Sequence, residues 1–595
     1  MSEKTNYSVL PTTAEETKGG SDPIIPQQKA TSRYRKFRSS LLKLSVAALG
    51  LYWVFSQTHG GGHRGGCFFK GKKPKYTFEG HFQDNIDKLV AGSLESSIVW
   101  DRLAEMTDTY GNRIAGSDAL EKSIDWIVEN VKSDGLSVIT EDVVVDYWER
   151  NEESLYFLSP TRGPVKLHML GLGFSVPTPD TNGLEAEVIV VNSREELDQI
   201  GEAGEVKGRI VLFNKPFESY SNDVIFRTMG ATWAQEYGAV AVLVRSVGPL
   251  SLQSTHTGNS NAASIPAASV SIEDAQLLAR SVKRHQQNPE KFSDWPKVKL
   301  TMNAKTALKS KVSRNIIVEL KGRETPEEVV VVGGHIDSWD VGSGAVDDGA
   351  GCFIAWETIR QLSKLEQPPR RTVRAVFWTS EENGSPGGRV YAANHPETNT
   401  TRHVFAFESD NGVFDPYGIR FTAGRRVQED PEKFNSYEFL TAAGEHFIAS
   451  RKDLSYPGAG SYVLPNGGGA DIAPLCKQGV ACAHFTPADP FPLPYSTSPY
   501  FIKDQPSEDL QDSDPHHRHH KSHHRRHHRH HHHHRHHEDD GEYRDPPRRP
   551  VDSGYFYYHH TEADTMGAFT PDQVKSSAAV MAIWTYIAAE SRVEL

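Results

Sequence analysis

Histidine and carboxylate side chains cluster directly after three apolar segments in the second half of the chain. The three segments, residues 328–333, 372–378 and 403–407, are typical of buried strands. The side chains that follow them are His335, Asp337 and Asp347 after the first, Glu381 and Glu382 after the second, and Asp410 after the third. Because an open α/β sheet binds its ligands at the carboxyl ends of its strands, we expect these groups to converge at one edge.

The segment YFYYHHTEADT adds a second imidazole near the C-terminus. We interpret residues 555–558 as a further extended stretch, followed by His560 four residues before Asp564. Two histidines with three carboxylates form a ligand set that suits zinc and needs no thiolate. Five ligands exceed what one tetrahedral ion uses, and a carboxylate that bridges two ions would account for the excess. The residues therefore predict a hydrolytic site that holds two Zn²⁺ ions.

The elements that must position these residues predict an α/β fold. Strand and helix patterns alternate around the candidate ligands, as in a doubly wound mixed sheet. Residues 150–304 differ because they consist of short strands and turns with few acidic or histidine clusters. We therefore predict an α/β domain formed by residues 76–149 and 305–595, with a β-rich domain inserted at 150–304.

Among the helices predicted in the α/β domain, two lie in the second half of the chain. Residues 349–365 place apolar side chains at helical spacing and are expected to form an amphipathic helix. Thr570, Pro571 and Gln573 are typical of a helix start, and this helix is expected to run to about Glu590.

At these motifs the chain resembles the dizinc exopeptidases of the aminopeptidase S and glutamate carboxypeptidase clan. The matching segments are VVVVGGHIDSWDVGSGAVDDGAG, RTVRAVFWTSEENG, HVFAFESDNG, YGNRIAGSDALEKSIDWI and GGGADIAPL. The inserted region, and IPAASVSIEDAQLLAR in particular, resembles a protease-associated domain. The likeness runs from about His81 to the end of the chain and omits one insert. It implies a zinc-exopeptidase fold whose inserted domain forms a rim beside the active site.

The resemblance also assigns roles to single residues. It implies that His335 and Asp410 bind one zinc ion, that Glu382 and His560 bind the other, and that Asp347 bridges them. Asp337 would orient the His335 imidazole, as expected for a carboxylate beside a metal-binding histidine. Glu381 would act as general base, taking a proton from a metal-bridging water, which leaves the attacking hydroxide, and passing that proton to the leaving amine. The Asp347–Asp348 peptide is expected to be cis, as in the family.

The chain departs from the family at one corner of this site. Related carboxypeptidases carry a tyrosine immediately before the last histidine ligand, where it steadies the oxyanion, and here that position is His559. We expect Tyr558 or His559 to serve instead, and the spacing to the following Asp-Thr pair selects His560 as the ligand. Asp471, in GGGADIAPL, is expected either to shape the site or to cap a helix.

The predicted function is zinc-dependent exopeptidase activity on small peptides, with dipeptides that have free termini as the expected substrates. The alternative is an aminopeptidase of the same clan. A catalytically inactive, receptor-like ectodomain is disfavoured because the five ligands and the base are all present. No other cofactor is expected, and the resemblance implies a homodimer.

The N-terminal sequence predicts entry into the secretory pathway. Residues 1–40 form a polar and basic tail that is expected to be disordered, and 41–56 are either a cleavable signal peptide or a signal anchor. Residues 57–75 are typical of a linker. The expected location is secreted or lysosomal, or alternatively that of a single-pass type II membrane protein. A net charge of −12 argues against nucleic-acid binding.

Two further features bear on this location. Cys476 and Cys482 are expected either to form a short-loop disulfide in an oxidising compartment or to remain buried thiols. Asn383 and Asn399 begin glycan acceptor triplets, a pattern that also occurs by chance.

Residues 490–550 contain a histidine- and arginine-rich insert that the family does not explain. Its composition cannot bury a core, so we predict disorder. It is either a tolerated loop expansion or a metal-binding or pH-sensitive arm. A metal carrier would depend on residues 516–537, whereas the peptidase hypothesis predicts that activity on small peptides survives their deletion.

Overall fold

The computed structural model describes residues 76, 78–261, 263–306, 309–398, 401–431, 435–490 and 554–595. The predicted tail, the apolar segment 41–56, the linker and nearly all of the histidine-rich insert lie outside the described residues. Tyr76–Leu595 forms a single unit. Among the described residues, no helix combines the length and the apolar character needed to cross a bilayer.

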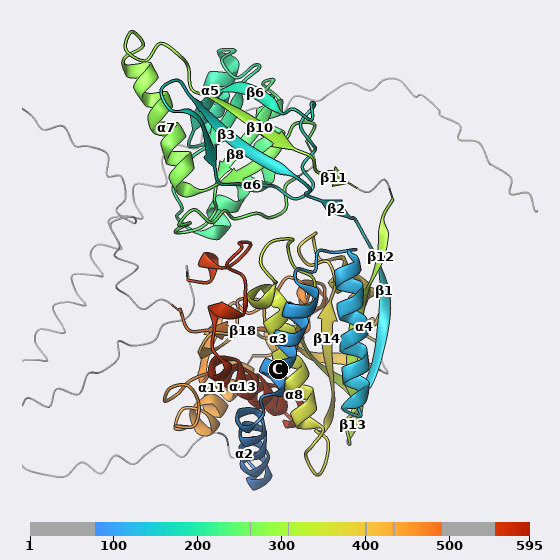
Figure 1. Ribbon diagram of the computed structural model, residues 1–595. Helices are drawn as coiled ribbons and strands as arrows, with labels where there is room; N and C mark the ends of the chain where they lie inside the picture. Colours follow the sequence, from blue (N-terminus) through green and yellow to red (C-terminus); the bar gives the residue numbers. More distant parts are fainter. Residues whose placement is uncertain are drawn as a thin grey trace, which may run out of the picture. The chain divides into compact units, whose positions relative to one another are not determined.

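The main sheet of the α/β domain has eight strands, drawn in Figure 1. Their order is β1-β12-β14-β13-β15-β18-β16-β17. The bounds are β1 Ser137–Val145, β12 Lys311–Leu320, β13 Thr325–His335, β14 Arg371–Trp378, β15 Arg402–Glu408, β16 Pro416–Thr422, β17 Tyr462–Pro465 and β18 Ala481–Pro487. Strand β13 pairs in parallel with β14 and β15, whereas β1–β12, β12–β14 and β16–β18 pair antiparallel. The sheet is therefore mixed, and the predicted fold class is confirmed.

Helices cover this sheet and complete its core. They are α2 Gly80–Glu95, α3 Ile98–Tyr110, α4 Asp118–Ser133, α8 Ala350–Leu362, α9 Pro386–Asn394, α10 Arg425–Glu429, α11 Ser436–Phe447, α12 Ala473–Gln478 and α13 Pro571–Glu590. Helix α13 starts with the predicted capping box between Thr570 and Gln573. Helix α8 was expected to be amphipathic, and this was wrong because all its residues are buried. It packs against α13, α2 and α3 as well as strand β13, so no face is left for solvent.

A second sheet of eight strands lies in the inserted region. Its order is β4-β3-β10-β6-β7-β8-β9-β5. The strands are β3 Glu153–Ser159, β4 Gly163–Leu167, β5 Met169–Gly171, β6 Leu184–Val191, β7 Ile210–Phe213, β8 Ala241–Arg245, β9 Ala267–Val270 and β10 Lys297–Met302. Helices α5 Arg194–Glu202, α6 Tyr220–Gln235 and α7 Ile272–Gln287 accompany them. This sheet has hydrophobic clusters of its own. The short strands β2 Trp148–Glu149 and β11 Lys305–Thr306 pair with each other where the chain enters and leaves the inserted region.

The disulfide alternative for the two neighbouring cysteines is the one that the structure contains. Cys476 in α12 is bonded to Cys482 in β18. The bond fixes α12 against the sheet next to the loop that carries Asp471. Cys352 is a buried free thiol within α8.

Candidate metal centre

The ends of β13, β14 and β15 bring the predicted side chains together at one edge of the main sheet. His335 is the last residue of β13, and Asp410 follows the end of β15. His335 Nε2 lies 3.1 Å from Asp347 Oδ1 and 3.6 Å from Asp410 Oδ1. His335 and Asp347 are almost fully buried, while a quarter of the Asp410 side chain is exposed. The group is therefore accessible from the Asp410 side.

The loop before α8 presents the Asp347 carboxylate. Residues Ala345–Gly349 form a single irregular turn, and the Asp347–Asp348 peptide is cis, as expected. Asp564 Oδ1 accepts a hydrogen bond from the Val346 amide at 2.6 Å. Arg113 is fully buried and donates at 2.7–2.8 Å to three backbone carbonyls of the loop between β13 and this turn, those of Ile336, Ser343 and Gly344. Sequence reasoning matched the motif that contains Arg113 and assigned the arginine no role.

Asp337 connects His335 to the turn that carries the two glutamates. Its Oδ1 accepts the Glu381 amide at 3.0 Å and its Oδ2 accepts the Glu382 amide at 3.4 Å. His335 Nδ1 lies 3.0 Å from the Asp337 backbone carbonyl oxygen and 3.6 Å from its Oδ1. Asp337 thus orients two structures at once.

Glu381 and Glu382 lie beyond the end of strand β14, so the alternation of side chains along a strand does not direct them. Strand β14 ends at Trp378, Ser380 adopts a left-handed φ of 66°, and both glutamates lie in the following turn. The chain must leave the sheet here because Asp337 binds both amides. The turn, rather than the pleat of a strand, directs the two carboxylates.

The segment before His560 was expected to be extended, and this was wrong. Tyr555–Tyr557 is a short 3₁₀ helix, and His560 has a left-handed φ of 60°. His560 Nε2 lies 2.9 Å from Glu382 Oε2 and 3.4 Å from Asp347 Oδ2. The His559 ring stacks on the His560 ring with 3.5 Å between centroids, and its Nε2 is 3.6 Å from Asp347 Oδ2.

Asp347 belongs to two groups of donor atoms that lie close enough together to hold a metal ion. The donor atoms of His335, Asp347 and Asp410 lie within 4.8 Å of one another, as do those of Asp347, His559 and His560. Asp347 Oδ2 and Glu382 Oε1 are buried without a hydrogen-bond partner in the described part of the chain. Buried charged oxygens without partners are unfavourable unless a cation binds them. These residues therefore fit a metal site.

The acid–base state of the cluster points the same way. Burial, together with the nearby carboxylates of Asp410, Asp337 and Asp347, raises the pKa of Glu381 to about 8. Burial also raises the pKa of Glu382 and Asp348 well above their usual values. Anionic groups have been brought together here without enough positive charge from the protein to balance them.

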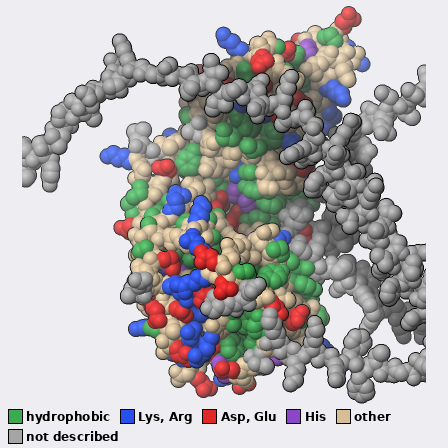
Figure 2. Space-filling model, turned by 180° about the vertical axis from the view of Figure 1, so that it is seen from behind, with side chains coloured by type: hydrophobic (Ala, Val, Ile, Leu, Met, Phe, Trp, Pro, Cys, Tyr) green, Lys and Arg blue, Asp and Glu red, His purple; other side chains and the backbone are tan. Residues whose placement is uncertain are grey.

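A cleft of about 460 Å³ opens beside these groups. It is lined by Tyr220, Glu408, Asp410, Asn411, Asn466–Ala470, His484, Tyr555, Phe556 and His559. On the face drawn in Figure 2, histidine and acidic side chains lie together near the middle. Tyr220 belongs to α6, so the inserted region contributes to the wall of the cleft. The volume suits a small ligand.

The two aromatic candidates for the missing tyrosine differ in position. Tyr558 packs against Phe414 and does not line the cleft, whereas Tyr555, which sequence reasoning missed, does line it. The Tyr555 hydroxyl is buried close to the Asp347 carboxylate, and it makes no hydrogen bond of normal geometry within the described residues. Burial raises the pKa of Tyr555 well above its usual value, and the nearby Asp347 raises it further, so the hydroxyl keeps its proton.

Asp471 does not cap α12, so the helix-cap alternative for this residue is wrong. Helix α12 has no side-chain cap, and both carboxylate oxygens of Asp471 are buried without a hydrogen-bond partner among the described residues. Glu408 turns the loop before α12 toward the cleft by accepting the amides of Ala470 and Ile472 at 3.0 and 2.9 Å. A lone glutamate at a strand end carries no sequence signal for this role.

Comparison with known proteins agrees with this arrangement. Residues 315–585 match peptidase family M28, and residues 178–278 match the PA domain. Carboxypeptidase Q from Homo sapiens is 33% identical over 82% of this chain and 85% of its own length. A peptidase M28 precursor from Shewanella amazonensis shares the fold with a TM-score of 0.66 and 27% identity, over 87% of this chain and 98% of that one.

A zinc aminopeptidase from Bacillus subtilis matches with a TM-score of 0.52 and 18% identity, over 83% of this chain and 95% of its own, and this likeness concerns the fold. The inserted region therefore contains a PA domain, as expected. The match to carboxypeptidase Q over 82% of this chain and the matched M28 region agree with the donor atoms at the sheet edge. The chain belongs to peptidase family M28 and is a zinc-type metallo-exopeptidase.

Proposed function

We propose that the protein hydrolyses small peptides with free termini, dipeptides above all, at a centre for two Zn²⁺ ions. The observation that carries the proposal is that Asp347 is common to two groups of donor atoms. His335 and Asp410 would complete one site, and Glu382 and His560 the other. Zinc bound there would acidify a water molecule and polarise the scissile carbonyl.

The residues of the chain divide the remaining work. Glu381 lies beside the donor groups and would take the proton from the attacking water and return it to the leaving amine. Asp337 supports this role because it holds the amide of Glu381 and backs the His335 imidazole. Its carboxylate would therefore fix the base, and its backbone carbonyl would fix one ligand.

His560, rather than His559, is the proposed second imidazole ligand. His560 Nε2 faces Glu382 and Asp347, whereas His559 lines the cleft and would contact the substrate. The Tyr555 hydroxyl would donate to the oxygen of the scissile carbonyl as negative charge develops there. Tyr555 is the one of the neighbouring tyrosines with an unpaired buried hydroxyl at the cleft.

An aminopeptidase is the second candidate, and the lining of the cleft favours it. Glu408 and Asp410 line the cleft, and no lysine or arginine does so among the residues that the structure describes. Carboxylates without basic neighbours suit a substrate ammonium group. By contrast, Asn411, Asn466 and the glycines at 467–469 supply neutral donors that suit a substrate carboxylate, as the first candidate requires.

The disulfide Cys476–Cys482 supports the proposed passage through the secretory pathway, because such bonds persist in oxidising compartments. Asn383 lies in the same turn as the two glutamates, and Asn399 lies outside the described residues. Glycosylation, a homodimer and a membrane anchor at 41–56 remain predictions.

A matched substrate panel tests the proposed function. Free dipeptides, N-acetylated dipeptides and C-amidated dipeptides would be given to the purified protein before and after chelation and after addition of Zn²⁺. We expect free dipeptides to be cleaved best, activity to disappear with chelator, and two equivalents of zinc to restore it. Equal cleavage of amidated dipeptides would favour the aminopeptidase. Failure of the zinc-loaded protein to cleave any member would overturn the proposal.

A further inference from the structure

The PA-containing insert reaches the turn that carries His560. The Thr257 amide donates to the His560 carbonyl oxygen at 2.9 Å, and His560 Nδ1 lies 3.2 Å from the Thr257 carbonyl oxygen. The two residues are 303 positions apart in sequence. The left-handed backbone of His560 is one that a residue with a side chain rarely adopts without outside support. The reciprocal pairing with Thr257 provides that support.

Arg227 in α6 holds Thr257 from the other side. Arg227 is buried, with 6% of its surface exposed. Its guanidinium donates to the carbonyl oxygens of Thr257 at 3.2 Å and Asn259 at 3.3 Å, and to the Tyr220 hydroxyl at 3.0 Å. Arg227 Nη1 also lies 3.3 Å from His560 Nδ1. A planar group with several fixed donors determines the position of a loop more closely than a lysine would.

The approach of Arg227 requires a glycine between the two carbonyls that it binds. Gly258 has a φ of 135°, and a Cβ atom there would lie 2.3 Å from the guanidinium carbon of Arg227. The segment 257–259 can therefore wrap around the guanidinium only because this position has no side chain.

Thr257 is also fixed to the α/β domain. Arg150 donates to Thr257 Oγ1 at 3.1 Å and binds both carboxylate oxygens of Asp340 at 2.8 and 2.6 Å. Asp340 lies in the loop between His335 and Asp347. Tyr220 stacks on Phe556 with ring centroids 4.6 Å apart, next to the turn with His560. These contacts fix the position of the Thr257 carbonyl relative to the proposed metal ligands.

We propose that the insert is a working part of the metal centre, with Arg227 and the Thr257 carbonyl as the positioning pair for the His560 imidazole. The inference rests on the proposed function, since it takes His560 as a zinc ligand. Binding of zinc by Nε2 leaves the proton on Nδ1, and the Thr257 carbonyl oxygen is the acceptor for that proton. The Asp337 carbonyl stands in the same relation to His335. One imidazole is thus held from within the α/β domain and the other from the insert.

Zinc affinity of the full-length protein tests this inference. The chelated protein would be titrated with Zn²⁺ alone, as wild type and as Arg227→Met, Arg227→Lys and Arg209→Met. Arg209 is the matched control because its guanidinium lies in the same domain, pairs with Glu187 and covers Trp295, away from His560. We expect Arg227→Met to lower the affinity for one of the two zinc ions about 10- to 100-fold. Arg227→Lys should recover part of the loss, and Arg209→Met should bind as wild type.

Two measurements keep a structural effect apart from a positioning effect. Thermal unfolding of the chelated proteins shows whether each variant is folded, and the visible spectrum of Co²⁺-loaded protein reports the ligand geometry. An altered spectrum, a lower affinity for one of the two zinc ions and an unchanged melting temperature together support the inference. Wild-type affinity for both equivalents in Arg227→Met would overturn it, and so would equal loss of both with a lowered melting temperature. Failure of the wild-type protein to bind zinc would instead overturn the proposed function.

Discussion

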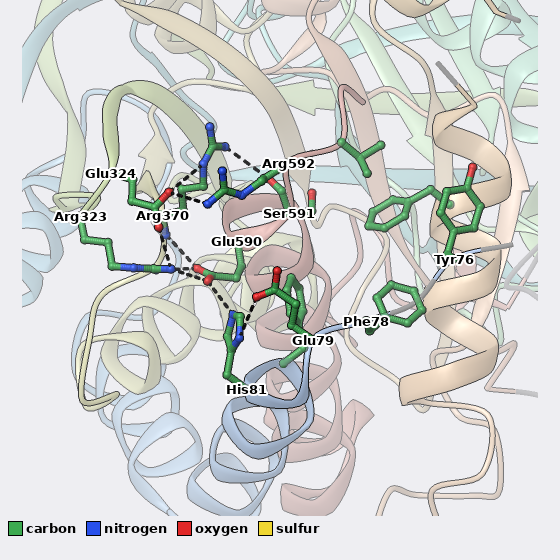
Figure 3. Close-up of a pocket in the computed structure, with 13 residues that line it drawn as sticks. Tyr76, Phe78, Glu79, His81, Arg323, Glu324, Arg370, Glu590, Ser591 and Arg592 are labelled. Atoms are coloured by element: carbon green, nitrogen blue, oxygen red, sulfur yellow. Dashed lines mark hydrogen bonds and ion pairs between the residues drawn. The ribbon is translucent and has the colours of Figure 1, made fainter. Parts of the chain in front are cut away.

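Two carboxylate clusters of the α/β domain, each with buried members, differ in what surrounds them. At the metal centre, the carboxylates of Asp347, Glu382 and Asp410 pair with the imidazoles of His335, His559 and His560, and no lysine or arginine of the described residues pairs with them. In the second cluster, both carboxylate oxygens of Glu590 accept hydrogen bonds from Arg323, at 2.6 and 2.7 Å (Figure 3). His81 Nε2 lies 3.0 Å from Glu590 Oε1.

Glu328 belongs to the second group, which we call the arginine-paired cluster: Glu324, Glu328 and Glu590 with Arg323, Arg370, Arg371, Arg402 and Arg592. Burial alone would raise the pKa of Glu328, yet hydrogen bonds from Arg371 and Arg402 hold it at about 2. Burial raises the pKa of Glu381 at the metal centre to about 8. On the face in Figure 2, basic and acidic side chains interleave over the lower part of the molecule.

The contrast teaches how to separate a structural charge cluster from a metal site. Buried carboxylates that have arginine partners are already neutralised and contribute to stability. Buried carboxylates that lack such partners require a proton or a metal ion. The number of acidic residues is therefore less informative than the identity of their neighbours.

The largest effect is expected at the metal centre for Glu381→Gln. Loss of the general base should lower kcat for free dipeptides by about 10²- to 10⁴-fold. Zinc content should stay at the wild-type level because the amide contacts from Asp337 are retained. Steady-state kinetics together with metal analysis measure both quantities. Glu382→Gln is the matched control and should lose zinc. Wild-type turnover in Glu381→Gln would rule out the assigned role.

A smaller loss is expected for Tyr555→Phe, which removes only the hydroxyl. One oxyanion donor contributes about 10²- to 10³-fold to kcat, and KM should change little. Tyr558→Phe should behave as wild type because Tyr558 packs on Phe414 away from the cleft. Kinetics of both variants on one dipeptide test the pair. A larger loss of kcat in Tyr558→Phe than in Tyr555→Phe would instead assign the oxyanion donor to Tyr558.

The smallest effect on catalysis is expected in the arginine-paired cluster, where Glu590→Gln should change stability instead. Loss of charged hydrogen bonds should lower the free energy of unfolding by about 1.5–3 kcal/mol, with kcat/KM unchanged. The Glu590 side chain is 3% exposed. Denaturant titration measures the change, and Glu366→Gln, whose exposed carboxylate pairs with Lys88, is the control. A loss of zinc in Glu590→Gln would erase the distinction between the clusters.

Much of the metal centre could be predicted from the sequence because its signals are local. His335 and Asp410 follow strands that the apolar pattern marks clearly, and parallel strands end at the same edge. The capped helix α13 was predictable for a similar reason, since its start depends on residues three positions apart. The sequence could not show that α8 is buried on every side, because that depends on which elements surround it.

What the sequence by itself determined was which residue types stand at the ends of the strands, and hence that a metal-dependent peptidase is possible here. Only the tertiary structure decided how the part of the site around His560 is built. The turn around His560, the hydroxyl of Tyr555 and the support from Arg227 depend on contacts across hundreds of positions, such as the 303 between Thr257 and His560. Local propensity and spacing carry no information at that range, because the partners are chosen by packing between domains.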